Sequence, residues 1–175
     1  MNTHLVITAL GNDKPGIVNK LSKAILEHGG NITESRMMAL SGEFAMMLLV
    51  AGEEDCIADI NSKLNDIGEN LGLTIVAKAT TLKEPEQKRL PYHVTVVSMD
   101  HPGIVHDISD FLSSRNLNIE EVETKTYPAA HTGTPMFSLD MIISIPTDSS
   151  IRTLRDEFLV FCDDLNLDAS LESKR

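Results

Sequence analysis

A near-repeat constrains the fold of this chain more than any other feature of its sequence. The letters "NDKPGIV" at residues 12–18 return as "MDHPGIV" at residues 99–105, which is an offset of 87 positions. At this offset residues 12–32 align with residues 99–119 without a gap, and 8 of the 21 positions are identical. Because self-similarity at a fixed offset indicates repeated structural units, we expect two domains of one fold.

The boundaries of the two domains follow from composition. The stretch "KEPEQKRLP" at residues 83–91 holds two prolines and five charged side chains, which is typical of a linker. We therefore assign residues 1–82 to the first domain, 83–90 to the linker and 91–175 to the second domain. Six extra residues enter the second copy near "PAAHTG", within a proposed loop at Tyr127 to Pro135.

Hydrophobic periodicity predicts the same order of elements in both copies. In the first, β-rich runs begin near residues 3, 31, 44 and 73, and two helical patterns lie between them. The order is βαββαβ, and the last strand of the second copy is short and weakly apolar. The helical faces are Ile17, Leu21, Ala24 and Ile25; Ile57, Ile60, Leu64, Ile67 and Leu71; Ile104, Ile108, Phe111 and Leu112; and Ile151, Leu154, Phe158, Cys162 and Leu165.

This order predicts an α+β fold with two ferredoxin-like domains, each a four-stranded antiparallel sheet with both helices on one face. The second strand of each domain then lies at a sheet edge, where its backbone groups lack a neighbour. We expect the two copies to pair along these edges within one chain, and further dimerisation of the chain stays open.

Charge and hydropathy exclude several classes of partner. The formal charge is −11, with 26 acidic side chains against 15 Lys and Arg, so most of the surface would repel a nucleic acid backbone. If the protein controls a gene, we expect it to act through another protein. The apolar runs are too short to span a bilayer, and the N-terminus lacks the features of a signal peptide, so we expect a cytoplasmic location.

The repeated loop has a chemistry suited to a small zwitterion. Each copy orders Asp, Pro and Gly at the start of its first helix, and we expect the Asp at the N-cap and the Pro in the first turn. Free backbone N–H groups beside the Gly could bind a carboxylate, and the Asp could bind an ammonium group. The same pattern is also a good capping device with no ligand. The residues are Asp13, Pro15 and Gly16, then Asp100, Pro102 and Gly103.

Other candidate sites are weaker. His101 and His106 do not share a helical face and have no further ligand nearby, so we expect no metal site. Cys56 and Cys162 lie in amphipathic helices, where a single Cys behaves as a small hydrophobe. No set of acid, base and nucleophile emerges from the sequence, so we expect neither an enzyme nor a cofactor.

These motifs carry a family resemblance. A strand, "GNDKPGIV", a helix ending in "GGNI" and the order βαββαβ resemble the ACT domain, a small amino-acid-binding regulatory module, and "SMDHPGIV" through "NLNI" repeats the match. Two such copies joined by a short linker are similar to the glycine cleavage system transcriptional repressor family. The resemblance covers the whole chain in architecture, whereas its specific motifs lie in the two loop, helix and strand blocks.

The resemblance implies a set of ligand-binding positions. In ACT domains the effector lies where two domains meet, between the loop before the first helix and the start of the second strand of the neighbouring domain. The two loops differ in sequence, because Lys14 corresponds to His101 and Asn12 corresponds to Met99, so the two sites need not be equivalent. The implied positions are Gly11, Asn12, Asp13, Gly16, Ile17, Asn31 and Ile32, with Ser98, Met99, Asp100, Gly103, Ile104, Asn118 and Ile119 in the second copy.

The resemblance also implies a mechanism. A protein of this family would bind a transcriptional activator of the LysR type and prevent activation of the glycine cleavage genes, and glycine or another small amino acid would relieve the inhibition. A regulatory subunit that docks on an amino-acid metabolic enzyme is the alternative. The loop at Tyr127 to Pro135 could contact such a partner or be a tolerated extension.

Overall fold

The structure is a computed structural model that describes residues 3–82 and 88–174. The chain divides into two compact units, unit 1 at residues 1–84 and unit 2 at residues 85–175. Each unit is described by itself. Residues 83–87 of the expected linker lie outside the described residues, and the first strand of unit 2 begins at Arg89.

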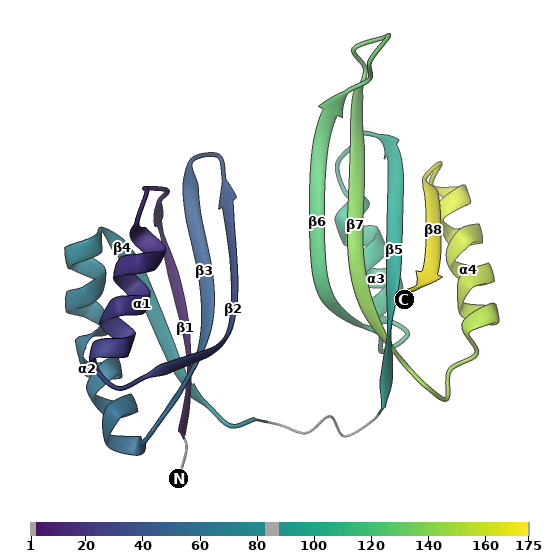
Figure 1. The fold of residues 1–175 in the computed structure, drawn as a ribbon. Coiled ribbons are helices and arrows are strands. Elements are labelled where there is room, and N and C mark those ends of the chain that lie inside the picture. The colour runs from purple at the N-terminus through teal and green to yellow at the C-terminus, as the bar shows by residue number, and fades with distance from the viewer. Residues whose placement is uncertain (1–2, 83–87, 175) are drawn as a thin grey trace. The chain divides into compact units, whose positions relative to one another are not determined.

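Unit 1 is a four-stranded antiparallel sheet covered by two helices on one face (Figure 1). The strands lie in the order β2-β3-β1-β4, so the central strand β1 pairs with β3 and β4. Both helices pack on the same side because each βαβ connection returns the chain over that face. The elements are β1 (Thr3–Asn12), α1 (Ile17–Glu27), β2 (Asn31–Leu40), β3 (Glu43–Gly52), α2 (Glu54–Leu71) and β4 (Leu73–Thr80).

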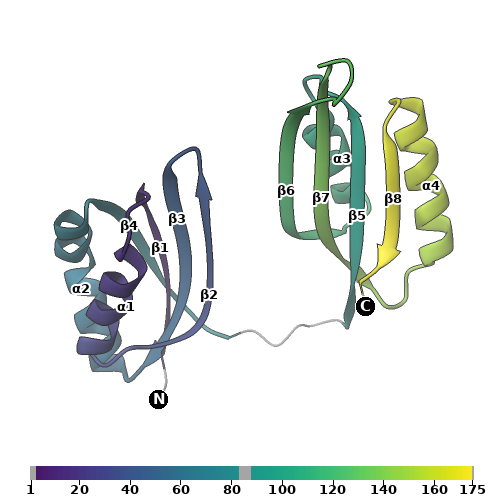
Figure 2. The same cartoon turned by 45° about the horizontal axis from the view of Figure 1, so that its top comes forward.

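Unit 2 repeats this topology with the strand order β6-β7-β5-β8 (Figure 2). The short run at the end of the sequence does form a strand, which pairs with β5 from Tyr92 to Val97. The expected fold class, two ferredoxin-like βαββαβ domains, is confirmed. The elements are β5 (Arg89–Met99), α3 (Ile104–Ser113), β6 (Asn118–Pro128), β7 (Pro135–Pro146), α4 (Ile151–Asp164) and β8 (Asp168–Ser173).

Each unit has its own hydrophobic core between the sheet and the helices. Alternate residues of the central strands point into it, as the period of two in a strand requires, and the apolar stripes of the helices cover them. The predicted helical faces are the ones that are buried or partly buried. Unit 1 buries Leu5, Ile7, Leu21, Ile25, Phe44, Leu48, Ile60 and Leu64 among others, and unit 2 buries Val94, Val96, Ile108, Leu112, Leu139, Met141, Phe158 and Cys162.

The outer strands β2 and β6 are irregular at the same place. The pairing of β2 with β3 skips Thr33, and the pairing of β6 with β7 skips Glu120, which is the position 87 residues later. Each is a bulge, an extra residue that increases the local twist of the strand. Both strands lie at a sheet edge, as predicted, and pairing between the copies along these edges stays a prediction.

The hairpin turns that join β2 to β3 and β6 to β7 differ in length. In unit 1 a two-residue turn at Ser41 and Gly42 has φ angles of 52° and 85°, the combination that a type I′ turn needs. In unit 2 the turn spans residues 129–134 and is closed by a hydrogen bond from Ala129 N to Thr134 O of 2.8 Å. Tyr127, Pro128 and Pro135, which the sequence placed in this loop, belong to the strands.

Candidate functional site

The repeated loops place glycine, not aspartate, at the helix N-caps. Helices α1 and α3 begin directly after Gly16 and Gly103, whose φ angles are 84° and 103°. The predictions that Asp13 and Asp100 cap the helices, and that a proline occupies each first turn, are therefore wrong. Each loop ends at a glycine in the left-handed backbone conformation, which other residues adopt with difficulty. The proline lies directly before this glycine, outside the helix.

Free amides at the helix starts are present as expected. The N–H groups of Val18 and Asn19 in unit 1, and of Val105 and His106 in unit 2, have no hydrogen-bond partner among the described residues. The first intrahelical bonds are Lys20 N to Gly16 O at 3.0 Å and Asp107 N to Gly103 O at 2.9 Å. Such unpaired amides at the positive end of a helix dipole can bind an anion.

The two aspartates are anchored alike through their backbones but differ in their side chains. Asp13 N donates to Gly42 O at 3.0 Å and Asp100 N donates to Pro135 O at 2.9 Å, so each loop is tied to the adjacent hairpin turn. The Asp100 carboxylate accepts a long hydrogen bond of 3.4 Å from Thr126 Oγ1. Unit 1 has Ala39 at that position, so its loop aspartate has no matching donor.

Several of the implied ligand positions serve the packing of the unit. A Cβ on Gly11 would lie 2.7 Å from Gly72 O, so the start of β4 requires a glycine there. Ser98 is buried and its hydroxyl donates to the carbonyl oxygen of Met99 at 2.9 Å. Ile17 and Ile104 place their side chains in the two cores, where only their backbones could meet a ligand.

The remaining implied positions lie at the surface. Asn12 and Met99 are exposed at the ends of their strands, and Asn31 and Asn118 are exposed at the starts of β2 and β6. Asn118 Nδ2 donates to Glu120 Oε1 at 2.9 Å. The neighbours of these asparagines, Ile32 and Ile119, are partly buried against the cores.

Neither unit brings its loop and its asparagine together. Strands β5 and β6 both pair antiparallel with β7, so they run parallel, and Met99 lies opposite Met136 whereas Asn118 lies opposite Ser144. Those partners are eight residues apart on β7, a distance of about 26 Å. The register in unit 1 gives the same separation. That the asparagine comes from a neighbouring domain stays a prediction.

A groove beside Asn118 extends the candidate site along α3. Its volume is about 420 Å³, and it lies between the helix and the start of β6. Sequence reasoning missed this groove, although its helical members recur at spacings of three and four residues, the period of one helix face. The lining residues are His106, Ser109, Asp110, Ser113, Leu117, Asn118 and Ile119.

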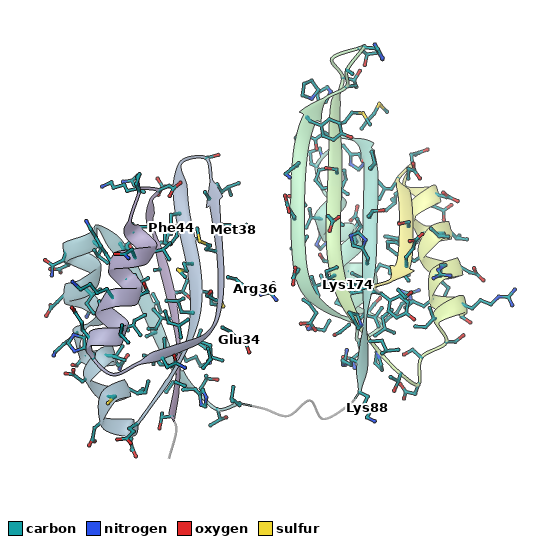
Figure 3. The ribbon with its side chains drawn as sticks, viewed as in Figure 1. Glu34, Arg36, Met38, Phe44, Lys88 and Lys174 are labelled. Atoms are coloured by element: carbon teal, nitrogen blue, oxygen red, sulfur yellow. The ribbon has the colours of Figure 1, made fainter. Side chains whose placement is uncertain are left out.

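The side of each sheet away from the helices, which we call the open face, differs sharply between the units. On unit 1 it carries exposed apolar side chains, each between 50% and 69% exposed, and Figure 3 shows Glu34, Arg36 and Met38 of β2 directed away from α1 and α2. The pairing register places the apolar residues on adjacent strands, so they form one surface, the apolar face. It consists of Leu10, Met38, Leu40, Met47 and Val76.

The open face of unit 2 is polar at three of the five matching positions, where Lys125, Asp140 and Ser170 replace Met38, Met47 and Val76, whereas Val97 and Tyr127 replace Leu10 and Leu40. Asp140 stands where unit 1 has Met47, and its Oδ2 lies 2.9 Å from His93 Nε2. Lys125, in the place of Met38, is 2.6 Å from Glu123, and this hydrogen bond raises the pKa of the lysine. Thr95 and Ser170 hydroxyls are 2.7 Å apart.

Two further findings concern metal sites and membrane-spanning helices in the described residues, 3–82 and 88–174. They contain no group of three or more His, Cys, Asp or Glu placed to hold a metal ion. None of their helices is long and apolar enough to cross a membrane.

Two comparisons with known proteins assign the chain to a family. Residues 3–78 match the family model described as ACT domain. The glycine cleavage system transcriptional repressor of Escherichia coli strain K12 is 30% identical over 168 residues, which are 96% of this chain and 88% of that protein.

Solved structures share the fold over both units. The crystal structure of a protein from Galdieria sulphuraria, described only as an unknown protein, superposes with a TM-score of 0.78 at 25% identity, covering 100% of each chain. A second crystal structure, of a protein provisionally described as a glycine cleavage system transcriptional repressor, gives a TM-score of 0.76 at 24% identity and covers 100% of this chain and 99% of the other.

Proposed function

Because this chain belongs to the glycine cleavage system transcriptional repressor family of ACT-domain proteins, we propose that it represses glycine cleavage genes by binding a LysR-type transcriptional activator, and that glycine relieves the repression. It acts without catalysis and without contacting DNA. Its place is the cytoplasm, where an activator protein would meet it.

The apolar face of unit 1 is the observation that supports a protein partner. Soluble proteins rarely expose a contiguous group of large apolar side chains, and where they do, the group marks an interaction site. Two of its members, Met38 and Met47, have flexible and polarisable side chains that adapt to a partner surface. The acidic chain, with a formal charge of −11, also favours a protein over a nucleic acid.

The loops before α1 and α3 supply the proposed effector response. Their free amides suit a carboxylate, and Asp13 or Asp100 suits an ammonium group, which together match glycine. Glycine must bind the free protein more tightly than the complex, since a ligand shifts an equilibrium only by its difference in affinity between two states. No cofactor enters this scheme.

The test is a direct binding measurement with the purified LysR-type activator of the same organism. Wild-type protein should bind it, and glycine should weaken the binding, as measured by titration calorimetry. The double variant Met38→Lys, Met47→Asp, which carries the unit 2 residues at these positions, should lose binding. Leu26→Lys is the control, because Leu26 is 71% exposed on a helix away from the apolar face.

Three outcomes count against parts of the proposal. Unchanged binding by the double variant would remove the apolar face from the mechanism. Capture of an amino-acid metabolic enzyme in place of the activator would favour the regulatory-subunit alternative. Loss of self-association in the double variant, with no activator binding by wild type, would identify a second copy of this chain as the occupant of the face.

A further inference from the structure

A polar hollow lies at the end of unit 2 where β5 and β6 begin and β7 ends. Its volume is about 380 Å³, near the lower end for ligand pockets, so it suits a small molecule. Three strands and the turn after α3 meet there, and every lining residue belongs to unit 2. The lining residues are Arg89, Asn116, Leu117, Asn118, Glu120 and Ser144.

The hydroxyl of Ser144 is the first sign of a ligand. Ser144 is only 7% exposed, and its Oγ has no hydrogen-bond partner among the described residues. A buried hydroxyl normally has a partner, because leaving it unpaired costs its lost hydration. A ligand oxygen in the hollow could supply the missing bond once the neighbouring Arg89 side chain adjusts.

Arg89 is the second sign. One of its N–H groups, at Nη1, donates to the carbonyl oxygen of Ser144 at 3.2 Å, and this bond holds the guanidinium beside the hydroxyl. A guanidinium has five N–H donors in a planar fork, a geometry that matches a carboxylate. The other donors of Arg89 have no partner among the described residues.

The opposite rim carries an acidic group and two amides. Asn118 Nδ2 donates to Glu120 Oε1 at 2.9 Å, which orients this carboxylate at the rim. A carboxylate offers about four lone-pair sites, so it can also accept from an ammonium group. Asn116 has a φ of 56°, and its side-chain amide can donate or accept at the mouth of the hollow.

The charge at this end of unit 2 favours an anionic group. Lys88 directly precedes Arg89 in the sequence, and Lys174 N donates to Pro91 O at 3.1 Å, so both lysines belong to the end of unit 2 where β5 begins (Figure 3). Among the other charged side chains of unit 2, Asp and Glu outnumber Lys and Arg. A lone anion would be repelled at longer range, whereas a zwitterion has no net charge and can use the local cations.

The described residues of unit 1 do not repeat the polar groups of this hollow. Its residues at the matching positions are Ala51 for Ser144, Gly29 for Asn116 and Thr33 for Glu120. The hydroxyl of Thr33 donates to Leu49 O at 3.2 Å, so it is already paired. The polar group in unit 2 is therefore no part of the scaffold that both copies share.

We propose that this hollow binds a small α-amino acid, with the carboxylate on Arg89 and Ser144 and the ammonium group on Glu120. It is a separate site from the loop before α3, which lies about 26 Å away along the sheet. The inference does not require that the protein represses any gene.

Isotope-labelled protein of residues 1–175, titrated with glycine, serine, acetate and methylamine, tests the assignment by nuclear magnetic resonance. Glycine or serine should shift the resonances of residues 116–120, Arg89 and Ser144. Acetate should bind more weakly and methylamine should not bind, because each offers only one of the two groups. Equal binding of acetate and glycine would show a simple anion site and overturn the amino-acid assignment.

Two variants separate this site from the loops. Ser144→Ala carries the residue that unit 1 has, so it should fold and keep or raise the unfolding midpoint while losing affinity. Arg89→Gln should weaken the binding at this site at least roughly tenfold, because it removes a charged hydrogen-bond donor. Asp100→Ala, in the loop, should leave the shifts in the hollow unchanged.

The failure of this inference differs from the failure of the proposed function. If amino acids shift only the loop resonances, or if Arg89→Gln and Ser144→Ala bind as the wild type does, the hollow is no amino-acid site, although the effector response survives. If no amino acid binds anywhere at millimolar concentration, both proposals fail.

Discussion

The two units both carry buried apolar residues on the side of the sheet that faces the helices, but they differ in residue type on the other side. Facing the helices, Phe44 matches Phe137, and Ile7 matches Val94, and all four are buried. On the open faces Met47 matches Asp140, Met38 matches Lys125 and Val76 matches Ser170, whereas Leu10 and Leu40 keep the large side chains Val97 and Tyr127 as counterparts. The comparison separates what the fold needs from what it leaves free.

The physical reason lies in the alternation of a strand. Neighbouring residues point to opposite sides, so the core side can stay constant while the open side changes without disturbing a single core contact. One copy has become a surface suited to a protein partner, and the other a network of polar and charged pairs. A duplicated fold thus allows two roles in one chain.

The largest expected effect tests the likeness of the buried sides. Phe44→Ala and Phe137→Ala should each destabilise their own unit by about 3–5 kcal/mol, because both leave a cavity in a packed core. Each unit contains one cysteine, Cys56 or Cys162, so pulsed thiol labelling in denaturant reports the units separately. A cost below about 1 kcal/mol in either unit would break the equivalence of the two cores.

A smaller effect sharpens one difference inside the cores. Cys162 lies in α4 at the place that Gly68 holds in α2, and burial raises the pKa of its thiol from 9.0 to about 12, with the Asp163 charge adding to the shift. The unfolded thiol loses its proton first, so the stability of unit 2 should fall as the pH rises from about 9 towards 12. The slope expected from this group is about 1.4 kcal/mol per pH unit.

Circular dichroism of the wild type and of Cys162→Ala, melted in denaturant at several pH values, measures this slope. The difference between the two proteins should be constant below pH 9 and should shrink above it. A constant difference up to pH 11 would mean that the thiol gains water in the folded state.

A third comparison concerns the side-chain contact that joins the two helices of each unit. Arg115 after α3 donates from Nη2 to Glu157 Oε2 at 3.0 Å and lies 3.7 Å from the centre of the Phe111 ring, whereas His28 after α1 meets Asp59 at 2.9 Å. Arg115→Ala should cost unit 2 about 1 kcal/mol, and His28→Ala should cost unit 1 less, because the histidine lacks the ring contact.

Thermal unfolding of the two variants, each against the wild type, checks this order. The pKa of Asp59 is lowered, chiefly by its hydrogen bond with Lys63, so the contribution of this carboxylate should be lost only as the pH falls below the ordinary range of an aspartate. A larger loss for His28→Ala than for Arg115→Ala would reverse the comparison.

The smallest expected effect belongs to the open faces. Met47→Asp and Asp140→Met exchange residues between exposed positions, and each should change the free energy of unfolding by no more than about 0.5 kcal/mol. Chemical denaturation gives the free energies, and analytical ultracentrifugation follows association. A large destabilisation by Met47→Asp would mean that the apolar face supports the fold of unit 1 itself.

The fold could be predicted from the sequence because patterns within single elements indicate it. Apolar spacing located the helical faces, and β-branched runs located the strands, since each signal lies within one element. It failed at the helix caps because the φ angles of Gly16 and Gly103 decide where the helices begin, and an Asp at the start of a helix suggested a cap that the backbone does not form.

The hollow in unit 2 was out of reach for a different reason. Arg89 and Ser144 are 55 positions apart and meet only through the strand register, which puts Ser144 opposite Pro91, two residues after Arg89. The separation of each loop from its asparagine also depends on strand direction. Neither fact can be predicted from a short segment of the sequence.

The bulges at Thr33 and Glu120 indicate that the two units descend from one ancestral unit. An extra residue at the same point of the same strand in both units is most simply a single event, inherited when one ancestral unit was copied. The longer turn at residues 129–134 and the polar residues Glu120 and Ser144 have no counterpart in the described part of unit 1, so these differences arose after the copying. The irregular strand is thus older than the two-unit chain, and the differences between its halves are younger.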